Sequence, residues 1–312
     1  GAGRRRASCA ARGAPPGRRR LPGVRPSTAC GTDASCPRCT SSGGAANGRV
    51  PLPQDNVTFD NGSFSGTSQT VTLDMPRAGK SIDWSGYNEG QSPAWAKTTT
   101  TTVYGSVTMI SGMTNSGGAS VTMEGRGSFT WTSGGQTLTN ALVINMFGGT
   151  LTLQDAFNSS SYIQIVSTSI LNANNFNITV SYFNASGGTP TITMGSGTWT
   201  LTGTTGWFAL AGMTVTPNTS TIVMSNTSAT NKPFSGAGKT YNNVTFSGDN
   251  ITVTGSNTFN VMAVNNAGYG GANGLILTIG TATTTITSLT TNATSTGDRA
   301  KIKSSTSGTI AG

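Results

Sequence analysis

Histidine is absent from the 312-residue chain. This absence excludes the Ser-His-Asp triad, the Cys-His pair and every zinc or haem site that needs an imidazole ligand. Residues 50–312 also lack cysteine, so this part of the chain has neither disulfides nor thiolate metal ligands. We therefore expect no metal and no cofactor, and the sequence identifies no catalytic, cofactor-binding or metal-binding residue.

All four cysteines lie near the start of the chain, at Cys9, Cys30, Cys36 and Cys39. Cys36 and Cys39 form a single CxxC motif. The two earlier cysteines do not have the spacing of a paired zinc knuckle, and no βαβ pattern supports a redox role. We interpret these cysteines as free or adventitiously paired thiols.

Charge is scarce, at 9% of residues, and it is unevenly distributed. Residues 1–49 contain ten arginines and one acid, Asp33, and so carry the whole net charge of +9. Residues 50–312 contain nine basic and nine acidic residues and are neutral. The basic segment is rich in Pro, Gly, Ala and Ser and has no apolar period, which predicts disorder. No aromatic residue interleaves its arginines, so we do not expect it to bind a specific nucleic acid.

Long apolar runs are also missing. No stretch approaches the roughly 18 residues of a membrane span, and the basic N-terminus has no apolar core of a signal peptide. The chain begins with Gly1, and Gly312 is expected to be an interior break of a longer protein. An extracellular location is inferred from the composition of residues 50–312 alone.

Those residues are rich in Thr, Ser, Asn and Gly, and short segments alternate apolar and polar side chains. This period of two, with β-branched polar residues, is typical of half-buried strands, and Gly-Gly pairs mark turns between them. No window has the apolar stripe of a helix, so the body is predicted to be all-β. The clearest strand segments are 56–59, 70–74, 106–109, 128–132, 150–153, 177–180, 191–194, 198–202, 250–253 and 284–287.

The strand segments recur imperfectly. Residues 121–132 return as 192–202, and 56–59 return as 243–246. Such recurrence indicates stacked units with a shared core, and we predict a right-handed parallel β-helix (β-solenoid) of about 10–13 coils of about 20–25 residues. Trp131 and Trp199 fall at equivalent places in the repeat and are expected to fill the core, as is the Trp207-Phe208 pair. The alternative architecture is a row of Ig-like β-sandwiches, which would recur at about 100 residues.

Several segments, such as 195–202, 218–222, 234–244 and 255–260, resemble a repetitive β-solenoid family. Its members are predicted surface proteins of uncultured bacteria and structural proteins of tailed bacteriophages. The resemblance covers about residues 55–312. It implies a parallel β-helix with a shaft-like or adhesive role, and it supplies no catalytic residues.

Two patterns suggest chemistry. Gly238-Lys239-Thr240 has the ending of a phosphate-binding loop, but the segment after it is predicted to be a strand, so we interpret it as a turn. Asp83 and Glu89 lie near Trp84, Tyr87 and Trp95, a cluster that could stack a sugar beside a pair of carboxylates. That reading would make the chain a polysaccharide-degrading glycosidase or lyase of the tailspike type.

The favoured interpretation is a protein that is not an enzyme. It would be an extracellular adhesin or fibre shaft whose partner is a glycan or a cell-surface receptor. Self-association as a homotrimer or filament is a further expectation.

Overall fold

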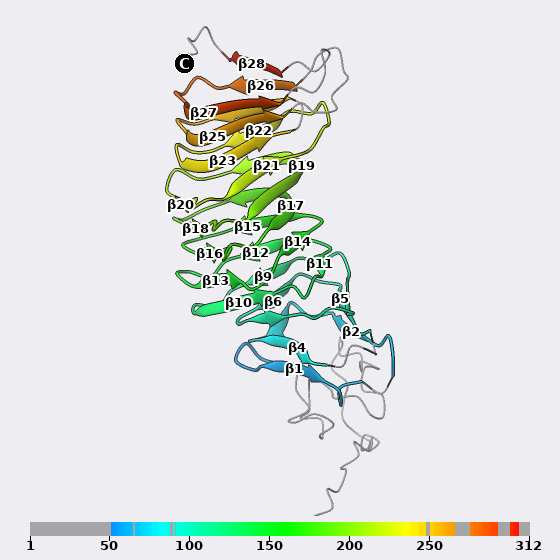
Figure 1. Cartoon of the computed structure of the whole chain (residues 1–312). Helices are drawn as coiled ribbons and strands as arrows, with labels where there is room; N and C mark the ends of the chain where they lie inside the picture. Colours follow the sequence, from blue (N-terminus) through cyan, green and yellow to red (C-terminus); the bar gives the residue numbers. More distant parts are fainter. Residues whose placement is uncertain are drawn as a thin grey trace, which may run out of the picture.

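The computed structural model describes residues 51–305 except 65, 88, 89, 91, 248, 249, 266–274 and 293–299. These residues form 28 strands and no helix, arranged as a β-solenoid of about 10 turns. Figure 1 shows the strands stacked in one column, from β1 at one end to β28 at the other. The predictions for residues 1–49, including the four cysteines, lie outside the described residues.

The strands form three parallel sheets of different length. The first three turns contribute strands to all three sheets, whereas β21 to β28 all belong to the third sheet. The first sheet consists of β1 (Val57–Asp60), β4 (Ile82–Gly86), β7 (Val107–Thr108), β10 (Ser128–Thr132), β13 (Thr150–Leu153), β16 (Ile170–Asn172), β18 (Thr191–Thr193) and β20 (Thr214–Thr216). The second consists of β2 (Thr70–Leu73), β5 (Ala94–Lys97) and β8 (Thr114–Ser116).

The third sheet is the largest and continues to the end of the described chain. It consists of β3 (Arg77–Gly79), β6 (Thr101–Val103), β9 (Val121–Met123), β11 (Thr137–Leu138), β12 (Leu142–Ile144), β14 (Phe157–Ser159), β15 (Tyr162–Ile165), β17 (Ile178–Ala185), β19 (Thr198–Phe208), β21 (Thr221–Met224), β22 (Lys232–Ser235), β23 (Thr240–Phe246), β24 (Ile251–Thr254), β25 (Thr258–Asn265), β26 (Leu275–Ile279), β27 (Thr285–Asn292) and β28 (Ala300–Ser304).

Every strand pair recorded among the described residues is parallel, which confirms the solenoid and excludes the Ig-like sandwiches. One turn takes 25 residues from Val57 to its partner Ile82, and 20 from Leu151 to Leu171. The lengths of later turns cover a wider range than the predicted length of about 20–25 residues: 18 residues separate Asn243 from its partner Val261, and 27 separate Val261 from Ser288. Most of the differences lie in the corners, because most strand pairs stay in register, although three of them contain a register shift.

The alternating sequence pattern sorts side chains between the core and the solvent. Leu151, Leu171 and Ile192 occupy one register position in successive turns, and all three are fully buried. The neighbouring position holds Thr152, Asn172 and Thr193, which are half-buried on the outer surface. The core is therefore a stack of apolar side chains, and the outer surface is a stack of hydroxyls and amides.

All five tryptophans are buried in this core, so the prediction for Trp131, Trp199 and Trp207 is confirmed. Phe208 is only half-buried. The equivalence of Trp131 and Trp199 is wrong, however: Trp131 lies in β10 of the first sheet and Trp199 in β19 of the third. The two copies of the repeat are thus out of phase by part of a turn, because a short alternating segment fits either sheet equally well.

The Gly238-Lys239-Thr240 segment is a turn followed by strand β23, as predicted. Gly238 has a φ of 73°, the left-handed conformation that glycine adopts without strain. No helix begins there, so the segment lacks the helix N-terminus of a phosphate-binding loop.

Candidate functional site

The aromatic cluster near Asp83 is not a sugar-stacking surface. Trp84 is fully buried and its ring lies 3.9 Å from that of Phe59, and Trp95 is 1% exposed. Tyr87 is also buried, with its ring edge-on to Phe64 at 5.3 Å. The alternative in which these rings stack a sugar is therefore contradicted: strand alternation places Trp84 and Trp95 in the core, and Tyr87 is buried just after β4.

The carboxylates are mostly engaged in holding turns. Asp83 accepts a hydrogen bond from the backbone N–H of Ser85 at 2.8 Å, and Glu89 lies outside the described residues. Asp155 accepts the N–H groups of Ser133 and Gly134 at 2.7 and 2.6 Å across adjacent turns. Within the described part of the chain, no group of three or more His, Cys, Asp or Glu side chains gathers as a metal site.

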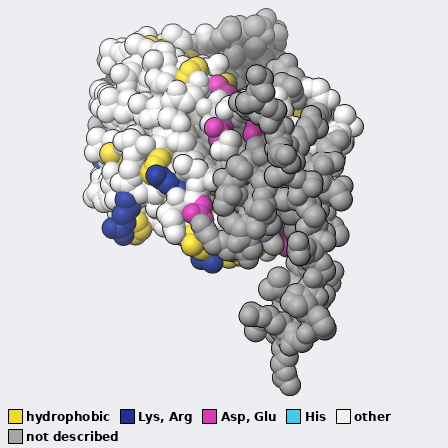
Figure 2. Space-filling view, turned by 90° about the horizontal axis from the view of Figure 1, so that it is seen from below, with side chains coloured by type: hydrophobic (Ala, Val, Ile, Leu, Met, Phe, Trp, Pro, Cys, Tyr) yellow, Lys and Arg dark blue, Asp and Glu magenta, His cyan; other side chains and the backbone are white. Residues whose placement is uncertain are grey.

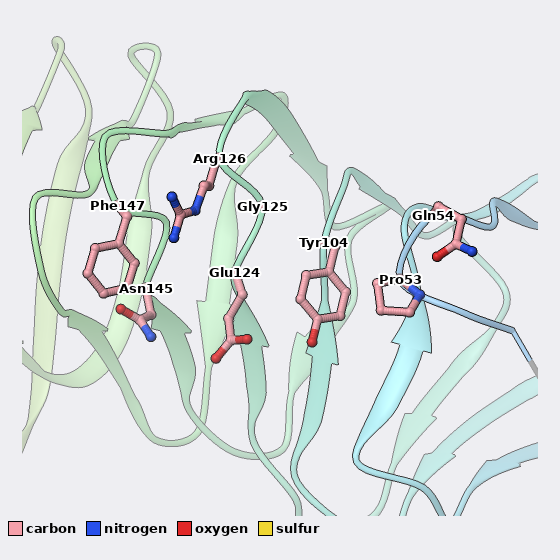
Figure 3. A pocket seen from close by; sticks show the side chains of 8 residues that line it. All are labelled: Pro53, Gln54, Tyr104, Glu124, Gly125, Arg126, Asn145 and Phe147. Atoms are coloured by element: carbon pink, nitrogen blue, oxygen red, sulfur yellow. The ribbon is translucent and has the colours of Figure 1, made fainter.

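A solvent-open groove lies at one corner of the solenoid and has a volume of about 560 Å³. We call it the corner groove. Figure 3 shows its side chains in a row across successive turns. The lining residues are Pro53, Gln54, Tyr104, Glu124, Gly125, Arg126, Asn145 and Phe147.

Strand register builds the centre of the corner groove. Tyr104, Glu124 and Asn145 each come directly after a strand of the third sheet, β6, β9 and β12. The N–H of Glu124 donates to the carbonyl of Val103 at 2.9 Å, and the N–H of Asn145 donates to that of Met123 at 2.9 Å. The parallel ladder thus continues past the strand ends and stacks a phenol, a carboxylate and an amide at one corner.

A close backbone approach shapes the turn that follows. A Cβ on Gly125 would lie 2.2 Å from Cε2 of Phe129 and 2.3 Å from the carbonyl oxygen of Tyr104. Only glycine fits there, and the chain can therefore turn sharply after Glu124. The turn leaves the next side chain, Arg126, exposed.

Phe147 is the most exposed large hydrophobic residue among the described residues, at 58%. Its φ of 42° is left-handed, a conformation that an aromatic residue rarely adopts. Gly188 has a φ of 62° at the matching position, three residues past the strand end, of a later corner. The guanidinium carbon of Arg126 lies 5.6 Å from the Phe147 ring centroid, in a cation–π contact.

The polar atoms of the groove are poorly satisfied within the protein. The side-chain oxygen of Asn145 is buried and has no hydrogen-bond partner. Within the part of the chain that the structure describes, the Glu124 carboxylate likewise makes no hydrogen bond and no ion pair. The groove therefore presents free acceptors, a cationic donor and an exposed aromatic ring, an arrangement suited to binding. Among the described residues that line the groove, Glu124 is the only carboxylate, whereas glycosidic hydrolysis uses a pair.

No protein-family model, curated protein or solved structure matches this chain. The assignment as a β-solenoid therefore rests on the strand pairing in the structure and not on similarity to a known protein. The described residues contain no helix that is long and apolar enough to cross a bilayer.

Sequence reasoning missed the corner groove completely. Its central residues are spaced by whole turns, and their alignment depends on the register of strands that contain only three residues each. One local signal was present: Phe147 precedes Gly148-Gly149, so a large aromatic residue occupies a glycine turn.

Proposed function

We propose that this chain is an extracellular structural or adhesive protein, an adhesin-like solenoid of a bacterial surface or the shaft of a phage tail fibre. It acts through its shape and surface, and it is not an enzyme. The resemblance of residues 55–312 to surface and phage structural proteins supports this proposal, and so does the parallel solenoid itself.

The polar groups on the outer surface of the solenoid support the adhesive role. The column of Thr152, Asn172 and Thr193 presents hydroxyl and amide groups at a spacing of about 4.8 Å, set by the parallel strands. Figure 2 views the molecule from the end of the column where β1 lies, and most of the described atoms there are backbone or side chains that are neither charged nor hydrophobic. Many weak hydrogen-bonding sites on a rigid support favour multivalent attachment to a glycan or a surface receptor.

Binding and cleavage are separated by one experiment. The full-length chain is incubated with a panel of bacterial surface polysaccharides, and both retention on the polysaccharide and the appearance of reducing ends are followed. We expect retention without new reducing ends.

The opposite result would support the tailspike enzyme. Release of oligosaccharides that disappears in Asp83→Asn or Glu89→Gln would overturn the non-enzymatic proposal. Absence of both retention and cleavage would remove the adhesive role and leave the shaft, which is tested by electron microscopy for fibres or trimers.

A further inference from the structure

We propose that the corner groove is a binding site for a neutral, hydroxyl-rich saccharide. In this site Phe147 is the stacking surface, and Asn145, Glu124 and Arg126 hydrogen-bond to the sugar. This inference rests on the adhesive function proposed above and assigns it a location and a ligand class.

Phe147 bears two costs that the fold does not require. A left-handed φ is unfavourable for a bulky residue, and an exposed aromatic ring gives up the burial that normally stabilises it. Gly188 shows that a corner of the same length forms without an aromatic residue. Arg126 covers part of the ring, and the remaining surface is open to solvent. An exposed aromatic ring is a suitable surface for the apolar face of a sugar.

Asn145 supplies a second and independent observation. Its side-chain oxygen is removed from solvent and has no partner, although buried polar atoms in proteins are almost always hydrogen-bonded. The Asn145 side chain as a whole is only half-buried, so a small rotation of its amide would bring this acceptor to the groove, where a ligand hydroxyl would satisfy it. The Glu124 carboxylate, one turn away in the same column, accepts a hydrogen bond from a second hydroxyl group, and Arg126 donates one to a ring or carbonyl oxygen of the sugar.

The charges select a neutral ligand. The opposite charges of Glu124 and Arg126 cancel within the groove. An acidic sugar would be repelled by the Glu124 carboxylate, and a cationic ligand would be repelled by the Arg126 guanidinium. A peptide that adds as an extra strand is disfavoured as well. The N–H groups of Tyr104, Glu124 and Asn145 already donate to the preceding turns, and no free backbone edge remains there. The volume of about 560 Å³ lies in the usual range of small-ligand sites.

The test uses the full-length chain and four variants. Phe147→Asn removes the ring but keeps a residue that tolerates a left-handed φ, and Phe147→Tyr keeps an aromatic surface. Asn145→Ala removes the unpaired acceptor. Leu289→Ala is the matched control, because Leu289 is 48% exposed and lies outside the groove. Each protein is titrated calorimetrically with short neutral oligomers of glucose and of N-acetylglucosamine, and with a galacturonic acid oligomer of the same length.

We expect wild type, Phe147→Tyr and Leu289→Ala to bind a neutral oligomer equally. Phe147→Asn should bind at least about tenfold more weakly, and Asn145→Ala about tenfold more weakly, the effect of one hydrogen bond. Thermal midpoints of Phe147→Asn and Asn145→Ala should not fall, because neither side chain is needed by the fold.

Three results would overturn the inference. If wild type and Phe147→Asn bind the oligomers equally, the groove is not the site, although the adhesive function stands. Preference for the acidic oligomer would contradict the neutral ligand. If no oligomer binds while the protein is still retained on the polysaccharides of the panel, the saccharide assignment of this groove fails and attachment occurs elsewhere on the solenoid.

Discussion

Lys97 places a charged group inside the solenoid. It follows Trp95 in the inward-facing positions of β5 and is fully buried. Its ammonium group donates to the side-chain oxygen of Asn115 and, at 3.2 Å, to the carbonyl of Ser116, and it lies 4.7 Å from the Trp95 ring centroid. Burial lowers the pKa of Lys97 from 10.5 to about 8, because the apolar surroundings disfavour the charged form.

This lowered pKa predicts a pH dependence of stability. Below pH 8 Lys97 is protonated in both the folded and the unfolded chain, and the folded state bears the full cost of the buried charge. Between pH 8 and 10.5 the Lys97 side chain is neutral in the folded chain but still protonated in the unfolded chain, so the free energy of unfolding rises with pH. The span from 10.5 to about 8 corresponds to roughly 3 kcal/mol.

The measurement is urea unfolding of wild type and Lys97→Met at several pH values. The free energy of unfolding of wild type relative to Lys97→Met should rise by up to roughly 3 kcal/mol between pH 8 and 10.5. Taking the difference removes the contributions of all other titratable groups, because the two proteins share them. A difference that does not change with pH would show that Lys97 is solvated.

At the scale of single elements, the corners depend on glycines for two separate reasons. Gly117 has a φ of 84°, and an added Cβ would lie 2.1 Å from the carbonyl oxygen of Lys97 in the preceding turn. Gly135 has a similar φ of 75° but has no heavy atom within 4 Å of that position. The two glycines therefore share a conformation and differ only in how closely the next turn approaches.

Alanine substitutions separate these two effects. Gly135→Ala should lower the free energy of unfolding by about 1 kcal/mol, the cost of a left-handed alanine. Gly117→Ala should cost about 3 kcal/mol or more, because the strands of two turns must also move apart. Chemical denaturation of the pair measures both values, and equal losses would contradict the close approach at Gly117.

Within single elements, the sequence indicated where strands form but not which of the three sheets each strand joins. Segments 56–59 and 243–246 share a sequence, yet they belong to β1 of the first sheet and β23 of the third. Alternation fixes which side chains face the core, since successive side chains of a strand point to opposite sides. It does not say which face of the solenoid the strand belongs to, because all faces share one core.

The whole molecule is a column in which each turn packs on its neighbours. About ten turns at about 4.8 Å give a column of roughly 50 Å. Two of its basic residues, Lys97 and Lys232, are fully buried, and the strands within each sheet, other than those at its ends, are hydrogen-bonded on both sides. Such a column should resist proteases along its length.

The basic first segment should behave differently. Residues 1–49 have ten arginines and no apolar period, so we predict that trypsin removes them rapidly and leaves a resistant product that starts near residue 50. Mass spectrometry of a limited digest identifies the product. Equal survival of both parts would show that residues 1–49 are folded against the solenoid.

The sequence by itself determined the all-β class, the solenoid and its apolar core. The class and the core follow from the local alternation of polar residues, mainly Thr and Asn, with apolar residues in most strands, and the solenoid follows from the recurrence of those segments. The tertiary structure decided the rest. It turned Trp84 and Trp95 inward and away from any ligand, and it aligned Tyr104, Glu124 and Asn145 beside the exposed Phe147. The physical reason is register: residues about 20 apart become neighbours only when parallel strands pair, and unequal corners make that pairing invisible in the sequence.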